Sequence, residues 1–269
     1  MITANGIQIK PTIFPDGTSQ VWQLPKEIFN TKHITIDWRF ENEREILDLF
    51  SLREILLDQW MTWSLEVPFL PYARQDKPVS NDNTFNLRVL AKLINQLGFT
   101  DVRSVDVHNP QLTSSLIERF VNVSPASIHK QLFEKLPDAM LVYPDEGARK
   151  RYDPDGSEYC KHRIVFEKTR DQSTGKITGH KVADRTPFKG FPKSYLILDD
   201  LCDGGATFIS IAKVLRVENP PADINLYVTH GVFSKTLEPL HRAGIRVYTT
   251  DSLKQKSTTE WNVMEIFKV

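Results

Sequence analysis

Cysteine is scarce in this chain of 269 residues, which contains only Cys160 and Cys202. Two cysteines without metal-like spacing provide neither a disulfide framework nor a cysteine metal site, so we expect a reducing, intracellular compartment. No apolar run is long enough to span a bilayer, and the N-terminus lacks the basic and apolar regions of a signal peptide. We therefore expect a cytoplasmic protein that does not bind membranes.

The chain also lacks an excess of either charge, because Lys plus Arg and Asp plus Glu number 34 each. Nucleic acids and anionic membrane surfaces are bound through a standing positive field, so neither is an expected partner. Two phosphate-binding patterns are missing as well. Neither a G-x-x-x-x-G-K-[ST] loop nor a G-x-G-x-x-G segment occurs in the chain, so any phosphate must be held by another arrangement.

Short apolar runs that end in polar residues alternate with segments of helical periodicity. This alternation predicts a parallel sheet covered by helices on both faces. Ligands of such sheets bind beyond the carboxyl ends of the strands. The apolar runs are 66–70, 102–107, 139–143, 195–198 and 226–229, and the charged residues that follow them include Arg74, Asp76, His108, Asp145, Asp199 and Asp200.

The stretch 152–191 has a different composition. It holds many charges, several glycines and prolines, and one short apolar run at 164–166. This pattern predicts a strand followed by a long mobile loop. Loops of this length inside compact domains are commonly functional.

The strongest local signal, at 195–208, is an apolar strand, two acidic residues, a small-residue turn and the start of a helix. Backbone N–H groups of such a turn form an anion site together with the helix N-terminus. The two carboxylates stand where vicinal ribose hydroxyls can donate to them. A plain turn with aspartate caps is the alternative interpretation. The residues assigned to ribose-phosphate binding are Asp199, Asp200, Asp203, Gly204, Gly205, Ala206 and Thr207.

This segment resembles the ribose-phosphate loop of the phosphoribosyltransferase fold. Further segments follow the motif order of the ribose-phosphate diphosphokinases, also called phosphoribosyl diphosphate synthetases: 71–77, 106–111, 143–151, 167–170 and 229–234. The resemblance implies two phosphoribosyltransferase-like α/β domains with parallel sheets, related by pseudo-two-fold symmetry. Residues 1–124 would form the first domain, with 255–269 returning to it. Residues 125–254 would form the second domain, which carries the ribose-phosphate loop.

The resemblance also implies an activity: Mg²⁺-dependent transfer of the β,γ-diphosphate of ATP to the anomeric hydroxyl of a ribose 5-phosphate unit. Lys168 and Arg170 would be the catalytic cations, although charges on a loop are otherwise read as a solvated surface. His108 and Asp145 would hold Mg²⁺, which commonly takes only one or two protein ligands. The residues implied in ATP binding are Phe14, Asp16, Arg74, Gln75, Asp76 and His108.

Phe14 and Asp16 would come from a neighbouring subunit, so the resemblance implies a homo-oligomer, a dimer or a hexamer. A core position is the alternative interpretation for Phe14. The partners are then ATP and a ribose 5-phosphate-type acceptor, with neither nucleic acid nor membrane.

One departure from the family pattern bears on the acceptor. Gly204 stands where the family has the first Thr of Asp-Thr-x-Gly-Thr. A turn opened in this way favours ADP-ribose, the acceptor of short, divergent phage-type members that rebuild NAD, over free ribose 5-phosphate. A non-catalytic regulatory subunit is the second alternative, but such a subunit could lose Lys168, Arg170 or His108, which are all present. A phosphoribosyltransferase ranks last, because it gives no reason for residues 74–77.

Overall fold

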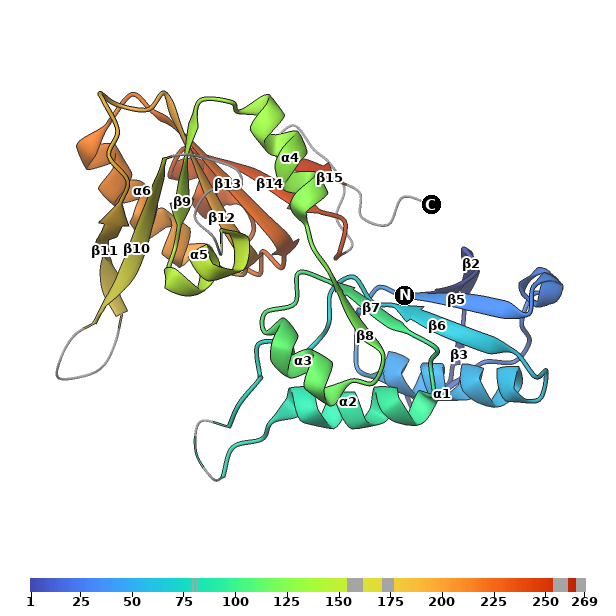
Figure 1. Ribbon diagram of the computed structural model, residues 1–269. Helices are drawn as coiled ribbons and strands as arrows, with labels where there is room; N and C mark the ends of the chain where they lie inside the picture. The colour runs from blue at the N-terminus through green and yellow to red at the C-terminus, as the bar shows by residue number, and fades with distance from the viewer. Residues whose placement is uncertain (79, 81, 154–161, 171–176, 254–260, 265–269) are drawn as a thin grey trace. The chain divides into compact units, whose positions relative to one another are not determined.

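The computed structural model describes residues 1–78, 80, 82–153, 162–170, 177–253 and 261–264. The chain divides into two compact units, Met1–Ser124 and Pro125–Val269 (Figure 1). Each unit is an α/β structure with a sheet whose central strands are parallel, so the expected fold class is confirmed. Among the described residues, no helix combines the length and apolar character needed to cross a bilayer.

The first unit has a sheet with the strand order β2-β1-β5-β6-β7-β8. Strands β5 to β8 run parallel, and β1 is antiparallel to β5. The strands are β1 (Ile2–Ala4), β2 (Ile7–Ile9), β5 (His33–Trp38), β6 (Thr62–Glu66), β7 (Val102–Val105) and β8 (Phe120–Val123). The helices are α1 (Arg44–Leu57), α2 (Asn86–Leu97) and α3 (Pro110–Leu116), and a separate hairpin pairs β3 (Thr12–Ile13) with β4 (Ser19–Gln20).

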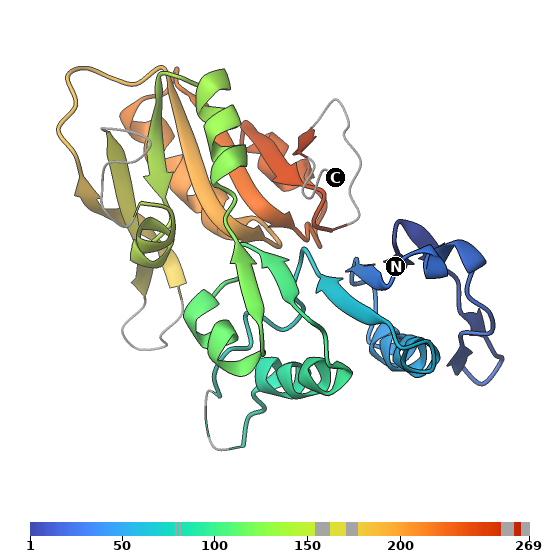
Figure 2. The same cartoon turned by 45° about the vertical axis from the view of Figure 1, so that its right-hand side comes forward.

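The three α-helices described in this unit lie on one face of its sheet (Figures 1 and 2). The reason is the strand order: β5 to β8 follow one another in sequence, and right-handed crossovers in one direction place every connecting helix on the same side. The expectation of helices on both faces is therefore wrong for this unit. Helix α2 illustrates the sequence pattern, since its buried residues Leu87, Leu90, Ile94 and Leu97 recur at helical spacing and the helix ends at Gly98, with φ 69°.

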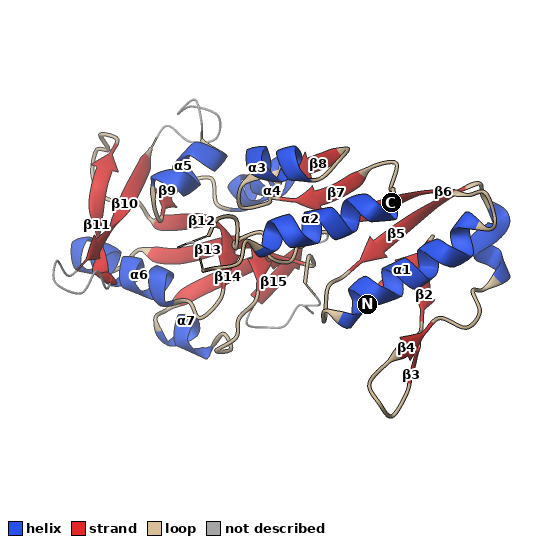
Figure 3. Ribbon diagram, turned by 90° about the horizontal axis from the view of Figure 1, so that it is seen from below, coloured by secondary structure: helices blue, strands red, loops and turns tan. Residues whose placement is uncertain are grey.

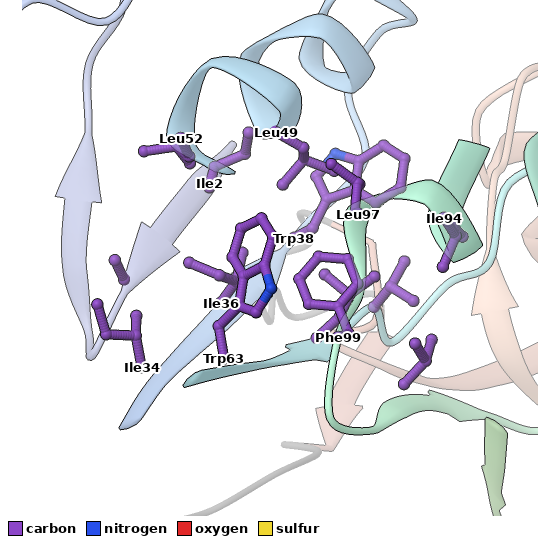
Figure 4. Packing of buried hydrophobic residues seen from close by; sticks show 14 of the residues in the cluster. Ile2, Ile34, Ile36, Trp38, Leu49, Leu52, Trp63, Ile94, Leu97 and Phe99 are labelled. Atoms are coloured by element: carbon purple, nitrogen blue, oxygen red, sulfur yellow. The ribbon is translucent and has the colours of Figure 1, made fainter. Parts of the chain in front are cut away.

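The core of the first unit fills the space between this sheet face and the helices. Trp38 of β5 is fully buried, and its indole N–H donates to Glu45 Oε2 of α1 at 3.0 Å. The rings of Trp63 and Phe99 stack beside it with centroids 4.4 Å apart (Figure 4). These side chains fix α1 and α2 against the parallel strands.

Trp38→Ala should lower the free energy of unfolding of the first unit by about 3–5 kcal/mol, because it leaves a large cavity. Trp60→Ala is the matched control, since Trp60 is 95% exposed and loses little packing. Urea denaturation followed by circular dichroism measures both. Equal losses in the two variants would show that the core is not organised around Trp38.

The second unit has a sheet with the order β11-β10-β9-β12-β13-β14-β15. Its strands are β9 (Ala139–Tyr143), β10 (Arg163–Arg170), β11 (Ile177–Arg185), β12 (Ser194–Cys202), β13 (Asp223–Gly231), β14 (Ile245–Thr250) and β15 (Trp261–Met264). Its helices are α4 (Ala126–Lys135), α5 (Glu146–Tyr152), α6 (Ala206–Glu218) and α7 (Glu238–Arg242). Only β11 runs against the parallel direction of the sheet.

The direction of winding reverses between β9 and β12. From β9 the chain passes through α5 to β10 on one side, whereas β12, β13 and β14 follow on the other side. Accordingly, α4 and α5 cover one face and α6 and α7 cover the other (Figure 3). On the first face, His129 of α4 packs edge-on against Tyr152 and Tyr227, with centroids 5.1 and 5.0 Å away. Burial there lowers the pKa of His129 to about 4, so the ring is neutral.

Two expectations about the second unit are wrong. Much of 152–191 is the antiparallel hairpin β10–β11 at one edge of the sheet, where charged residues on the exposed positions gave the appearance of a loop (Figure 2). The C-terminal residues Trp261–Met264 do not return to the first unit. They pair with β14, whose outer edge offers unpaired backbone groups, and the remainder of 255–269 lies outside the described residues.

Candidate functional site

Strands β9 and β12 lie on either side of the point where the winding reverses. Both strands end at residues that the sequence analysis predicted to bind a ligand or a metal. Asp145 follows β9, and residues 199–207 include the end of β12, a turn and the start of α6. In open parallel sheets, ligands bind in the crevice beyond the carboxyl ends of the strands where the winding reverses. The second unit therefore places Asp145 and residues 199–207 at the expected position of a ligand site.

Asp145 is the N-cap of α5. Its Oδ1 accepts a hydrogen bond from the Ala148 N–H at 3.0 Å, and its Oδ2 lies 3.3 Å from Lys168 Nζ. Burial acts to raise the pKa of Asp145, but the Ala148 N–H and the Lys168 ammonium together outweigh burial and hold the pKa below its usual value. The carboxylate is thus ionised and half-exposed.

Lys168 reaches Asp145 because β10 is longer than its neighbour. Val165 pairs with Tyr143, the last residue of β9, so Lys168 lies three residues beyond the end of that strand. It is half-exposed and stands at the carboxyl edge of the sheet. Arg170 continues the same strand, but its side chain lies outside the described residues, so its predicted role next to Lys168 stays a prediction.

The two acids at the end of β12 are not equivalent. Asp200 is buried, and its Oδ2 lies 3.2 Å from Arg151 Nη1 of α5. Among the described residues, Asp199 has no such ion pair at contact distance. Burial, and next the charge of Asp200, raise the pKa of Asp199 well above its usual value. Arg151 thus holds Asp200 in place, whereas the predicted role of Asp199 in ribose binding stays a prediction.

The turn between β12 and α6 depends on its two glycines. Gly205 is the N-cap of α6 in the left-handed conformation, with φ 76°, and a Cβ on it would lie 2.9 Å from Leu240. No side chain caps α6, so the N–H groups of its first turn are available to an anion. Beside Gly204 a Cβ would meet the Lys235 side chain at 3.3 Å. The space that Gly204 leaves is therefore filled by Lys235, which does not fit the expectation of an opened turn.

In the first unit, the segments 71–77 and 106–111 come together. The Asn109 side chain donates to Asp76 at 3.2 Å, and Asn86 of α2 donates to Gln75 at 2.7 Å. Tyr72 and Asp106, one in each segment, have positive φ angles of 63° and 47°. Such angles are uncommon outside glycine and often accompany functional sites.

Arg74 is exposed at this edge and His108 is half-buried. His108 belongs to the first unit and Asp145 to the second, so their joint metal site remains a prediction.

Phe14 and Asp16 occupy the β3–β4 hairpin. Asp16 accepts hydrogen bonds from the N–H and the hydroxyl of Thr18, at 3.0 and 2.7 Å. Phe14 is half-buried and packs against Trp22, with ring centroids 6.3 Å apart. Phe14 is thus a residue of a surface hairpin and not a core residue of this unit.

Sequence reasoning missed three residues of this region: Arg151, Lys235 and His180. Arg151 is the last residue of the segment 143–151. The sequence signal for it was its place in the same helical segment as Asp145. Lys235 directly follows the segment 229–234. His180 was hidden because its strand had been read as a loop, although the glycine before the run 177–185 is typical of a hairpin turn.

Gly205→Ala should destabilise the second unit by roughly 1–3 kcal/mol, the cost of a non-glycine residue in a strained backbone region, with the Leu240 contact adding to it. Gly204→Ala is the matched control, because its Cβ meets only the flexible Lys235 side chain. Thermal unfolding compares the two variants. A smaller loss of melting temperature in Gly205→Ala than in Gly204→Ala would contradict this account of the turn.

Comparison with known proteins gives a consistent result. No protein-family model matches the chain. The ribose-phosphate pyrophosphokinase of Thermococcus kodakarensis is 27% identical over 268 residues, which cover 98% of this chain and 92% of that protein. The protein of the same name from Pyrococcus abyssi is 27% identical over 253 residues, covering 93% of this chain and 85% of that protein.

A solved structure shows the same fold. The phosphoribosylpyrophosphate synthetase from Mycobacterium smegmatis superposes with a TM-score of 0.74 at 21% sequence identity, covering 95% of this chain and 85% of that one. The names of these two relatives refer to ribose-phosphate and not to ADP-ribose. Along nearly its whole length, the chain is thus similar to ribose-phosphate pyrophosphokinases, and it has the fold of a phosphoribosylpyrophosphate synthetase.

Proposed function

We propose that this protein is a Mg²⁺-dependent diphosphokinase that transfers the β,γ-diphosphate of ATP to the anomeric hydroxyl of ribose 5-phosphate. One observation carries the proposal: the reversal between β9 and β12 brings the Lys168–Asp145 pair and the 199–207 segment to the same edge of one sheet. The similarity to ribose-phosphate pyrophosphokinases over nearly the full chain supports it.

The acceptor would bind at residues 199–207. The N–H groups of the turn and of the first turn of α6 would hold the 5-phosphate, because they carry partial positive charge and lack a side-chain cap. Asp199 would accept hydrogen bonds from the vicinal ribose hydroxyls. Arg151 keeps Asp200 in place behind it, at 3.2 Å, so the ribose is oriented by one carboxylate and not by two.

In the transfer, the anomeric oxygen forms a bond to the β-phosphorus of ATP. The bond between that phosphorus and the oxygen shared with the α-phosphorus breaks, AMP leaves, and the hydroxyl proton passes to solvent water. Phosphoryl transfer of this kind depends on positioning and charge neutralisation more than on covalent chemistry. Lys168 at the sheet edge would neutralise the moving diphosphate, and Arg170 is proposed as its partner.

Mg²⁺ would be held by Asp145 and, from the first unit, by His108. Asp145 fits this role, because its lowered pKa keeps it ionised and carboxylate oxygens are preferred Mg²⁺ ligands. Across the described parts of the chain, no group of three His, Cys, Asp or Glu side chains surrounds one point. Phosphate oxygens and water would therefore complete the coordination. When bound, the ion would neutralise charge on the ATP phosphates.

ATP would bind with Arg74, Gln75 and Asp76. Their segment is held by two hydrogen bonds, one accepted by Gln75 from Asn86 of α2 and one accepted by Asp76 from Asn109. Phe14 and Asp16 on the β3–β4 hairpin would complete the ATP site of a neighbouring subunit. The exposed apolar side chains Ile13 and Trp22 on that hairpin, 56% and 65% exposed, support its proposed contact with another copy.

ADP-ribose is the acceptor that the sequence favoured, and it has less support than ribose 5-phosphate. The argument rested on space beside Gly204, and Lys235 fills that space. The relatives are named for ribose-phosphate. A non-catalytic role has no observation in its favour, because Lys168 and Asp145 are in place and in contact.

The decisive assay incubates the protein with Mg·ATP and either ribose 5-phosphate or ADP-ribose, with AMP and the product mass measured by mass spectrometry. We expect AMP and a ribosyl 1-diphosphate from ribose 5-phosphate. Lys168→Ala should reduce kcat about 100-fold, as for other positioned charges, and Lys181→Ala, whose ion pair with Glu167 lies outside the site, should not. Product from ADP-ribose alone would overturn the acceptor, and no AMP with either acceptor would overturn the activity.

Asp199→Asn should raise the melting temperature at pH 7–8 while weakening acceptor binding. A carboxyl whose folded pKa is raised contributes its stability below the unfolded value, 3.8, and loses it as the pH rises through the folded pKa. At neutral pH the buried, ionised Asp199 therefore lowers the free energy of unfolding of the wild type, and the neutral amide removes this loss. Each kcal/mol regained should raise the melting temperature by about 2–4 °C. The gain should disappear as the pH falls toward 4. A gain that is independent of pH would contradict this explanation.

A further inference from the structure

His180 is a buried polar side chain that has no role in the reaction proposed above. It lies on β11 directly opposite Lys168 of β10 and is only 8% exposed. Neither ring nitrogen has a hydrogen-bond partner among the described residues. A neutral imidazole always has one N–H donor and one acceptor nitrogen. Burying both without partners costs free energy, so this ring is placed for something other than stability.

The position of His180 across the hairpin directs it to the proposed site. Directly opposed residues of antiparallel strands share one face of the sheet, so His180 and Lys168 stand side by side. The charges of Lys168 and Asp145 both act on the ring: burial and the Lys168 charge lower the pKa of His180, and Asp145 opposes them. His180 is therefore within electrostatic reach of the pair that defines the carboxyl edge.

The strand that carries His180 also runs along α6, whose N-terminus forms the anion-binding turn. Arg185, at the end of β11, pairs with Glu218, at the end of α6, at 2.5 Å. From Arg185 back to His180 an extended strand covers roughly 16 Å, and from Glu218 back to Ala206 a helix covers about 18 Å. Because both elements run in the same direction from that shared point, His180 stands level with the first turn of α6.

We propose that His180 is a phosphate-binding residue that donates a hydrogen bond to the diphosphate neutralised by Lys168. The group would lie between the Lys168–Asp145 pair and the first turn of α6. The ring stands on the strand that pairs with the one carrying Lys168, and a phosphate oxygen supplies the acceptor that the described residues do not. Lys168, on a flexible four-carbon stem, contributes charge. The imidazole N–H donates along one line in the plane of the ring, so it also sets the orientation of the phosphate group. This role rests on the proposed function for the identity of its ligand.

The first test is binding of inorganic diphosphate, observed on the ring itself. In protein with ¹⁵N-labelled histidine, the His180 resonances are assigned by their loss in His180→Phe. Titration with sodium diphosphate should shift them saturably, while sulfate at equal ionic strength should not. The internal control is His129, which packs between Tyr152 and Tyr227 on the other face of the sheet and should not respond. Saturation of the protein with diphosphate without a change at His180 would overturn the proposal.

The second test compares variants. His180→Phe keeps a flat ring without a donor and should weaken diphosphate binding roughly tenfold, the effect of losing one hydrogen bond to a charged group. His180→Asn keeps a donor and should recover part of the affinity. Lys181→Ala is the matched control, since Lys181 pairs with Glu167 on the adjacent register position. Wild-type affinity in a folded His180→Phe would overturn the proposal. If that variant does not fold, the loss of resonances in His180→Asn supplies the assignment, and the ring titration decides.

The outcomes separate this inference from the proposed function. If ribose 5-phosphate yields no AMP but the His180 ring still responds to diphosphate, the phosphate-binding role stands and the reaction is wrong. If AMP forms and the ring is silent, the reaction stands and the role of His180 is wrong. With an active wild type, His180→Phe should lower kcat more than it raises the KM for ribose 5-phosphate, because the donor contacts the diphosphate.

Discussion

Parallel pairing of β9 with β12 is the constraint on which the rest of the second unit depends. The two strands are neighbours in the sheet although partners lie 55 positions apart in the sequence, since Ser194 pairs with Ala139 and Ile197 with Val142. Parallel neighbours end at the same edge, and because the winding reverses there, no helix crosses the gap between their carboxyl ends. Asp145 and residues 199–207 therefore face one crevice as a consequence of topology, before any side-chain contact forms.

Charge is distributed over this edge so that some groups are satisfied within the protein and others are not. Arg151 neutralises Asp200, and Lys168 contacts Asp145. Burial and the charge of Asp200 raise the pKa of Asp199, and the buried ring nitrogens of His180 have no hydrogen-bond partner among the residues that the structure describes. Sites that bind charged ligands commonly accept such local costs, because the ligand supplies the missing partners. The pattern separates the residues whose charge is paired within the protein from the two, Asp199 and His180, for which we propose contacts with a ligand.

The sequence predicted more of the fold than of the site. Apolar runs and helical spacing located β9, β12 and α6, because buried parallel strands and amphipathic helices have strong periodic signatures. The edge hairpin β10–β11 was missed, since an edge strand exposes one side and carries charges such as Lys181 and Asp184 there. The motifs led to predictions for the residues within them, whereas His180 and Lys235 lie outside the motifs and were not predicted. Both were noticed only through neighbours that are distant in the sequence: His180 lies opposite Lys168 in the strand pair, and Lys235 packs beside Gly204.

The β10–β11 hairpin has one more consequence, which concerns local stability. β10 is paired to β9 only from Arg163 to Val165, and beyond that point the described partner of β10 is β11. Irregularities in register interrupt the ribbon at Val165/Phe166 and again at Thr169/Arg170. A two-stranded ribbon is marginally stable by itself, and bulges add twist and remove ladder bonds. The segment that carries Lys168 and His180 should therefore open without the rest of the sheet, with backbone amides that exchange with solvent sooner than those of β12 or β13.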